Sequence, residues 1–216
     1  DQARYRAVNI GLAGSFATAA WRAAVATGID ISDGGGLPLE RALREDAGRK
    51  ELVLHLSGVR GVTNSVLEAL CRNLPEQLGK LSLGFDDCSG LTSLAELGSR
   101  LSGLVALTSL SLSFRSCEGL SSLAELALGL SGLAGLTSLV LDFASCRGLI
   151  SGGLAELGHS MVSLRNLTSL SLNFRGCKGL TALPELGGGL SVLTGLTEFE
   201  LDLSECSGIT SGLAEL

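Results

Sequence analysis

The 216-residue chain has few of the side chains on which most binding chemistry and catalysis depend. It contains eight aromatic residues, one methionine, two histidines and three lysines. With 16 basic against 22 acidic residues it carries a formal net charge of −6, so it offers no basic surface that could follow a phosphate backbone. Nucleic-acid binding is therefore disfavoured. Neither His55 nor His159 stands beside a recognisable nucleophile motif, and no phosphate-cradling glycine motif follows a strand, so we expect no enzyme activity, cofactor or metal.

Leucine and glycine are abundant instead. The chain has 47 leucines and 30 glycines, and 45% of its residues are hydrophobic. A chain of this composition can bury a sizeable core packed with leucine, so a disordered protein is not expected.

Five of the six cysteines recur at a nearly constant spacing. Each stands in the same phrase, as in LSLSFRSCEGL from Leu110, and a further copy without cysteine begins at Leu52. The sequence therefore indicates an array of six repeats. The periodic cysteines are separated by 29, 29, 31 and 29 residues: Cys88, Cys117, Cys146, Cys177 and Cys206.

Each repeat is expected to hold one strand and one helix. Leu110, Leu112 and Phe114 alternate with serines, which is the period of a strand with one buried face. After the glycine, leucines follow at spacings of three and four, as from Leu91 to Leu107, and this spacing is typical of a helix that faces a core. Neither element can bury its apolar side alone, so consecutive copies must stack, strand beside strand and helix beside helix.

The phrase L-x-L-x-F-x-x-C-x-G-L, followed by a leucine-spaced helix, resembles the leucine-rich repeat in a long, cysteine-bearing variety of about 29 residues. The likeness covers residues 52–216. It implies an α/β fold, a leucine-rich-repeat solenoid with a parallel concave sheet and outer helices, preceded here by an N-terminal helical segment. It also implies a protein-binding role without catalysis.

The periodic cysteines could be metal ligands, disulfides or a structural ladder. A straight row cannot supply the four converging sulfurs of a zinc site, and disulfides between repeats would need side chains turned toward each other. A ladder of buried thiols, each donating to a neighbouring turn carbonyl, is favoured. Reduced thiols predict an intracellular, reducing compartment. Cys71 lies outside the register.

The solvent-facing strand positions form the candidate binding surface. They carry no aromatic anchor, although interface hot spots favour Trp, Tyr and Arg. The candidate partner contacts are Arg115, Arg175, Asp142 and Asp202, and the alternative is that they are solvated surface charges. On the helical side Glu96 precedes Arg100 by four residues, which predicts an ion pair.

The first 50 residues differ in character from the array. Residues 5–28 are predicted to form a helix whose anchor side chains, Tyr5, Phe16 and Trp21, contact another subunit. A glycine-rich linker follows, and Pro38 opens a short helix that we expect to cap the array. The predicted division is therefore an attachment segment at 1–36, a capping helix at 37–50 and six repeats at 51–216.

These features together predict a non-enzymatic interaction or scaffold subunit whose partners are other protein subunits of a larger assembly. The alternative is an accessory subunit of an organellar membrane complex, photosynthetic or respiratory, attached through the N-terminal helix. Residues 5–28 would then contact the membrane, although Arg22 at the bilayer centre would cost roughly 2.5 to 3.5 kcal/mol.

Overall fold

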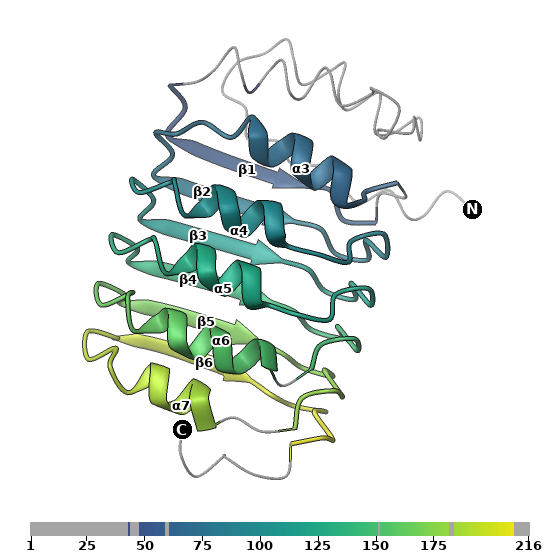
Figure 1. Ribbon diagram of the computed structural model, residues 1–216. Helices are drawn as coiled ribbons and strands as arrows, with labels where there is room; N and C mark the ends of the chain where they lie inside the picture. The colour runs from purple at the N-terminus through teal and green to yellow at the C-terminus, as the bar shows by residue number, and fades with distance from the viewer. Residues whose placement is uncertain (1–42, 44–47, 59–60, 151, 182–183, 210–216) are drawn as a thin grey trace.

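The computed structural model describes Leu43 and residues 48–58, 61–150, 152–181 and 184–209. The predicted helix at 5–28, the linker and most of the predicted cap lie outside the described residues, although Leu43 is helical and buried. Strands and helices alternate along the described chain (Figure 1). The strands are β1 (Glu51–His55), β2 (Lys80–Gly84), β3 (Ser109–Ser113), β4 (Ser138–Asp142), β5 (Ser169–Asn173) and β6 (Glu198–Asp202). The helices are α3 (Asn64–Arg72), α4 (Ala95–Leu101), α5 (Ala124–Leu130), α6 (Gly152–Met161) and α7 (Pro184–Leu190).

The six strands form one parallel sheet in chain order, from β1 to β6. Every pair keeps the same repeat position opposite itself, so that Leu81 pairs with Leu52 on one side and with Leu110 on the other. The described helices all cover one face of this sheet (Figure 1). The architecture is the predicted one, an α/β leucine-rich-repeat solenoid.

The core lies between the sheet and the helices. In β3, β4 and β5 the residues alternate between buried leucines and half-buried residues, as the period of two predicts. Just beyond the strands, four phenylalanines are fully buried and stack on one another, with ring centroids 5.4 to 5.8 Å apart. Offset stacking at this distance is favourable for aromatic rings. The stack consists of Phe85, Phe114, Phe143 and Phe174.

The helices are shorter than the leucine spacing predicts. In the second repeat, α4 ends at Leu101, and Leu104 and Leu107 lie in turns closed by hydrogen bonds from each of their amides to the carbonyl three residues before, both 2.9 Å from N to O. The turns keep a spacing of three, so the sequence pattern does not distinguish them from helix. Arg100 is a further correction: its guanidinium donates to the Leu74 carbonyl, and no ion pair joins it to Glu96.

Neighbouring helices touch through glycine backbone. A Cβ atom on Gly98 would lie 2.0 Å from the Glu125 carbonyl oxygen, and one on Gly129 would lie 2.2 Å from the Gly98 oxygen. The same contact recurs between Gly189 and Gly158, at 2.1 Å. Any side chain at these glycines would push the repeats apart on the helical side.

The repeat that is two residues longer changes only the helical side. Its helix, α6, has 10 residues, whereas α4, α5 and α7 have 7 each. The register across it is unchanged, because Leu139 of β4 still lies opposite Leu170 of β5.

Each strand is followed by a turn whose second residue adopts a positive φ. Asp87, Ser116, Ser145 and Glu205 have φ between 57° and 63°, and glycine with a φ of 72° fills the equivalent places at 58 and 176. The backbone pairing continues through this turn, since the Asp87 amide donates to the Arg115 carbonyl at 2.8 Å. Four non-glycine residues therefore occupy a conformation that favours glycine.

Candidate functional site

The candidate site is the face of the sheet opposite the helices, which we call the polar sheet face. Its side chains come from alternate strand positions, and the constant register arranges them in columns across the strands. Most are small or polar. The first column holds Glu51, Lys80, Ser109, Ser138, Ser169 and Glu198; the second Val53, Ser82, Ser111, Val140, Ser171 and Glu200; the third His55, Gly84, Ser113, Asp142, Asn173 and Asp202.

Two ion pairs between neighbouring repeats hold the arginines that the sequence singles out. The Arg115 guanidinium lies 3.4 Å from a carboxylate oxygen of Asp142, and Arg175 lies 2.6 Å from Glu205. The hydrogen bond and the charge of Glu205 raise the pKa of the Arg175 guanidinium. Both arginine side chains remain 55% exposed, so each can still reach a partner.

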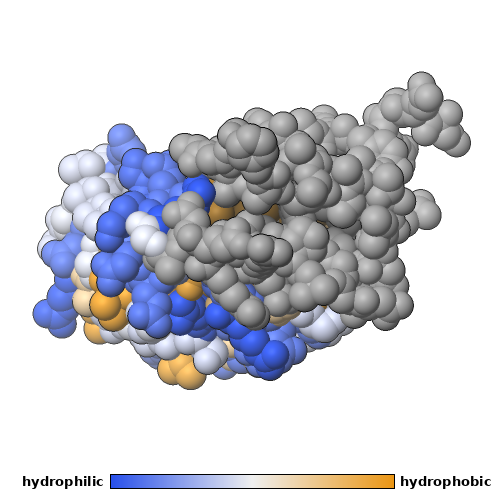
Figure 2. Space-filling model, turned by 90° about the horizontal axis from the view of Figure 1, so that it is seen from above, coloured by the Kyte–Doolittle hydropathy of each residue, from blue (hydrophilic) through white to orange (hydrophobic). Residues whose placement is uncertain are grey.

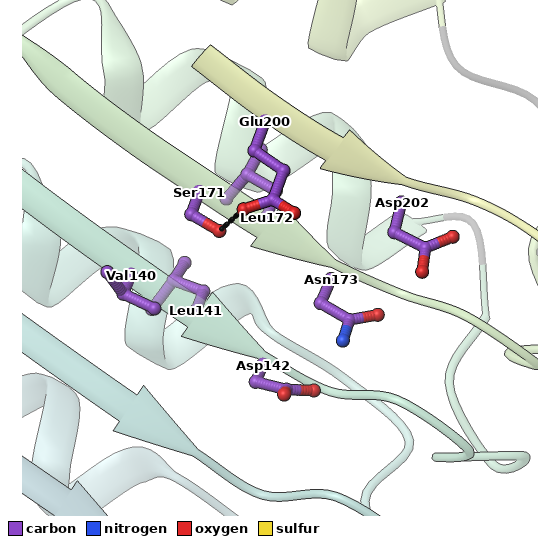
Figure 3. A pocket seen from close by; sticks show the side chains of 8 residues that line it. All are labelled: Val140, Leu141, Asp142, Ser171, Leu172, Asn173, Glu200 and Asp202. Carbon is purple, nitrogen blue, oxygen red and sulfur yellow. Dashed lines mark hydrogen bonds between the residues drawn. The ribbon is translucent and has the colours of Figure 1, made fainter. Parts of the chain in front are cut away.

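A shallow hollow of about 200 Å³ lies over β4, β5 and β6 (Figure 3). Asp142, Asn173 and Asp202 line it from equivalent positions of the three strands, and the Ser171 hydroxyl donates to the Glu200 carboxylate at 3.0 Å. The hydroxyl and the amide of Ser204 donate to Asp202 and lower the pKa of its carboxyl group. Asp142 and Asp202, which the sequence proposes separately, are thus brought to one hollow two strands apart.

At the other end of the polar sheet face, His55 lies over Gly84. A Cβ atom on Gly84 would be 2.3 Å from Nδ1 of His55, so only glycine leaves room for this ring position. In the sequence, His55 and Gly84 fall in the same column of strand positions. The useful signal was the glycine that interrupts a column of larger residues at the position directly opposite.

The periodic cysteines lie buried just after the turns that follow β2 to β6, and their thiols donate to the preceding repeat. The Cys117 thiol donates to the Phe85 carbonyl, with Sγ and O 3.1 Å apart. The same bond recurs from Cys146, Cys177 and Cys206, at 2.9 to 3.0 Å, and from Cys88 to Leu56 at 3.5 Å. All six cysteines are free, including Cys71.

Burial favours the protonated form of five thiols by raising the pKa values of Cys71, Cys117, Cys146, Cys177 and Cys206. It raises the pKa of Cys117 to about 11 and that of Cys177 to about 12, and it does the same for Cys71, to about 12. A neutral thiol is a poor nucleophile and a poor metal ligand. Within the described ranges, no group of three or more His, Cys, Asp or Glu residues could hold a metal ion.

The described surface is mainly hydrophilic in the view of Figure 2, with hydrophobic residues in small separate spots. Exposed apolar side chains include Val105 and Leu128, which come from different repeats. No helix among the described residues is long and apolar enough to cross a membrane. The predicted contacts Tyr5, Phe16 and Trp21 lie outside the described residues, and so does the proposed membrane segment at 5–28.

No family model matches the chain, and no curated protein matches it. Among solved structures it is similar to the leucine-rich repeat-containing protein LegL7 from Legionella pneumophila, with 21% sequence identity and a TM-score of 0.34. The match covers 71% of this chain and 61% of the LegL7 chain, so this chain spans less than two thirds of LegL7. The solenoid architecture rests on the six strands in constant register, with their repeated cores, and not on this likeness.

Proposed function

We propose that this protein is a protein-protein interaction and scaffold subunit, without catalytic activity, that binds its partner through the polar sheet face. The observation that carries the proposal is the pre-organisation of this face. Backbone pairing fixes each strand, and ion pairs such as Arg115 with Asp142 hold side chains of neighbouring repeats in place. A surface that is ordered before binding loses little conformational entropy when a partner docks.

The strands of the face supply about half the area of one standard protein contact. Six strands about 4.8 Å apart, each of five residues, cover roughly 24 by 17 Å, or about 400 Å². A standard interface takes about 800 Å² from each partner. A partner would therefore cover the whole face and reach the turns that carry Arg175 and Glu205 as well.

Bulk placed on the face tests the proposal. The double variant Ser82→Tyr, Ser111→Tyr fills the second column, whereas Ser99→Tyr with Leu128→Tyr adds the same two rings on the exposed helical side. The captured partners, identified by affinity purification and mass spectrometry, should be lost with the first variant and kept with the second, at unchanged melting temperature. A photo-crosslinker at Ser111 should then attach to the same partner. Partners that survive the first variant would refute the proposal.

We further propose that the protein works in an intracellular, reducing compartment. Six free cysteines, all buried, support this, because none depends on an oxidising environment for its structural role. Titration of the denatured, unreduced protein should return six thiols. A lower number would show that disulfides form in the native setting.

A further inference from the structure

The turns that follow β3, β4 and β5 gather basic side chains. Four of the ten Lys and Arg residues in the described ranges lie here, although the whole chain carries a formal net charge of −6. Figure 1 shows these turns one after another on the side of the solenoid where the strands end. We call this region the basic turn surface, and it consists of Arg115, Arg147, Arg175 and Lys178.

The stacking of the repeats brings these four residues together. The Ser145 amide donates to the Arg175 carbonyl at 2.7 Å, so the backbone pairing of the strands continues through the turns. Arg115 and Arg175 therefore stand two strands apart, with about 10 Å between their Cα atoms. Arg147 and Lys178 each follow the cysteine of their repeat, so they occupy equivalent positions of adjacent repeats, about 4.8 Å apart.

The centre of the basic turn surface carries only small side chains. Ala144 stands between Arg115 and Arg175 in the column and is 4% exposed. The next position of the following repeat is Gly176, where a Cβ atom would lie 3.5 Å from the Ser145 hydroxyl oxygen. A chain segment of a partner can therefore come close to this backbone, with basic side chains on both sides of it.

The basic side chains remain available to a partner. The ion pairs of Arg115 and Arg175 leave both side chains 55% exposed, and Arg147 is 65% exposed at 3.8 Å from a carboxylate oxygen of Glu118. Lys178 is exposed and has no ion-pair partner among the described residues. Exposed ion pairs contribute little to stability, so the carboxylate of a partner can replace the present one at low cost.

We propose that the basic turn surface binds an acidic segment of the partner protein that covers the polar sheet face. This inference rests on the proposed function and adds the chemistry of the partner. Guanidinium groups pair with carboxylates through two parallel hydrogen bonds, and arginine is favoured at the centre of interfaces. A nucleic acid does not fit, because its further phosphates would meet the carboxylates of the adjoining hollow: Asp142, Glu200 and Asp202.

A labelled Glu-Glu-Pro-Glu-Glu-Pro peptide tests the proposal in a fluorescence anisotropy titration of the 216-residue chain. The matched control, Gln-Gln-Pro-Gln-Gln-Pro, has the same length and nearly the same shape without the charges. Proline keeps both peptides extended, so they differ little in the entropy that binding costs. The neutral peptide should bind at least about tenfold more weakly, and binding of the acidic peptide should weaken with added salt.

Charge reversal locates the site on the protein. Arg147→Glu, Lys178→Glu should weaken binding of the acidic peptide by about tenfold or more, and it should capture less of the partners that the wild type captures. Arg72→Glu, Arg165→Glu changes the net charge equally at two exposed residues elsewhere and should leave both results within twofold. If the first variant is not folded by circular dichroism, Arg147→Gln, Lys178→Gln takes its place, with a loss of at least threefold expected.

Four results would overturn the proposal. Equal binding of the acidic and neutral peptides would exclude carboxylate recognition, and equal losses in the two charge-reversal variants would reduce the effect to general electrostatic attraction. Tighter binding of a six-nucleotide oligothymidine would assign the surface to nucleic acid. Unchanged partner capture by the variant that loses the peptide would separate the surface from this partner.

The proposed function fails on a different result. Partners that survive Ser82→Tyr, Ser111→Tyr would refute the role of the polar sheet face, and these two residues lie on β2 and β3, outside the basic turn surface. The peptide titration does not depend on them, so the same variant should bind the acidic peptide within twofold of the wild type.

Discussion

Replacement of Cys117 measures how much the thiol ladder contributes to stability. Its side chain is fully buried, and its thiol donates to the Phe85 carbonyl at 3.1 Å. In Cys117→Ala the buried sulfur and its hydrogen bond are lost, and the cavity left behind adds to the cost, so we expect a loss of about 1 to 2 kcal/mol. The Phe85 carbonyl keeps a second donor, the Cys88 amide at 3.2 Å, which limits the penalty.

Cys117→Ser should be at least as destabilising as Cys117→Ala. A C–O bond is shorter than a C–S bond, so the serine hydroxyl falls short of the carbonyl and lies beyond the 2.5 to 3.0 Å typical of O–H···O bonds. A buried hydroxyl with a poor partner costs roughly 1 to 3 kcal/mol. Cys206→Ser should cost less because Cys206 is 8% exposed, whereas Cys117 is fully buried.

Guanidinium unfolding followed by circular dichroism gives the free energies, and a second probe, thiol labelling, detects any stepwise unfolding of the array. For a chain of this size each kcal/mol also lowers the melting temperature by about 2 to 4 °C. If Cys117→Ser is as stable as the wild type, the hydroxyl is satisfied and the geometric reasoning fails. If Cys117→Ala is also neutral, the ladder contributes nothing.

Three further predictions concern the helices, the turns and the thiols. Gly129→Ala should destabilise by about 1 to 3 kcal/mol, because the new Cβ atom meets a carbonyl oxygen of the neighbouring helix at 2.2 Å. Gly188→Ala, whose new Cβ atom has no atom within 4 Å, should be neutral or stabilising, and the denaturant midpoints of the two variants measure the difference. Ser145→Gly, at φ 63°, should stabilise the fold by up to about 1 kcal/mol, and Gly176→Ser should destabilise it by a similar amount. If both substitutions shift the melting temperature equally and in the same direction, the conformational argument is wrong. Burial raises the pKa of Cys177 from 9.0 to about 12, so the unfolded chain loses this proton at a lower pH than the folded chain. The stability of the protein should therefore fall as the pH rises through this range, and it should fall less in Cys177→Ala. An equal loss of stability in both proteins would rule the thiol out as the cause.

The strands and their register could be predicted because one observation, the period of two locked to a 29-residue repeat, determines both. Helix length could not, since Leu104 and Leu107 continue the helical spacing into turns. Positive φ in the turns was also hidden from the sequence, because Asp87, Ser116 and Glu205 occupy a place where glycine would have signalled it.

The columns of the candidate site could be read from the sequence, but the pairs within it could not. Arg115 meets Asp142, 27 residues away, only because two repeats stack. The hydrogen bond of Arg100 to Leu74, and not to the nearby glutamate, depends in the same way on the neighbouring repeat. Contacts within one repeat follow from the local spacing, whereas contacts between repeats depend on how far each side chain reaches.

The longer repeat has a consequence for how such an array can change. Two extra residues enlarge the helix between β4 and β5 and leave the two strands in register. The length of a repeat is thus constrained on the sheet side and variable on the helical side. Insertions of one or two residues near a helix leave every column of the polar sheet face aligned, while duplication of a whole repeat would lengthen that face by about 4.8 Å and add one new residue to each column. The helical side can therefore vary in length while the arrangement of the polar sheet face is preserved.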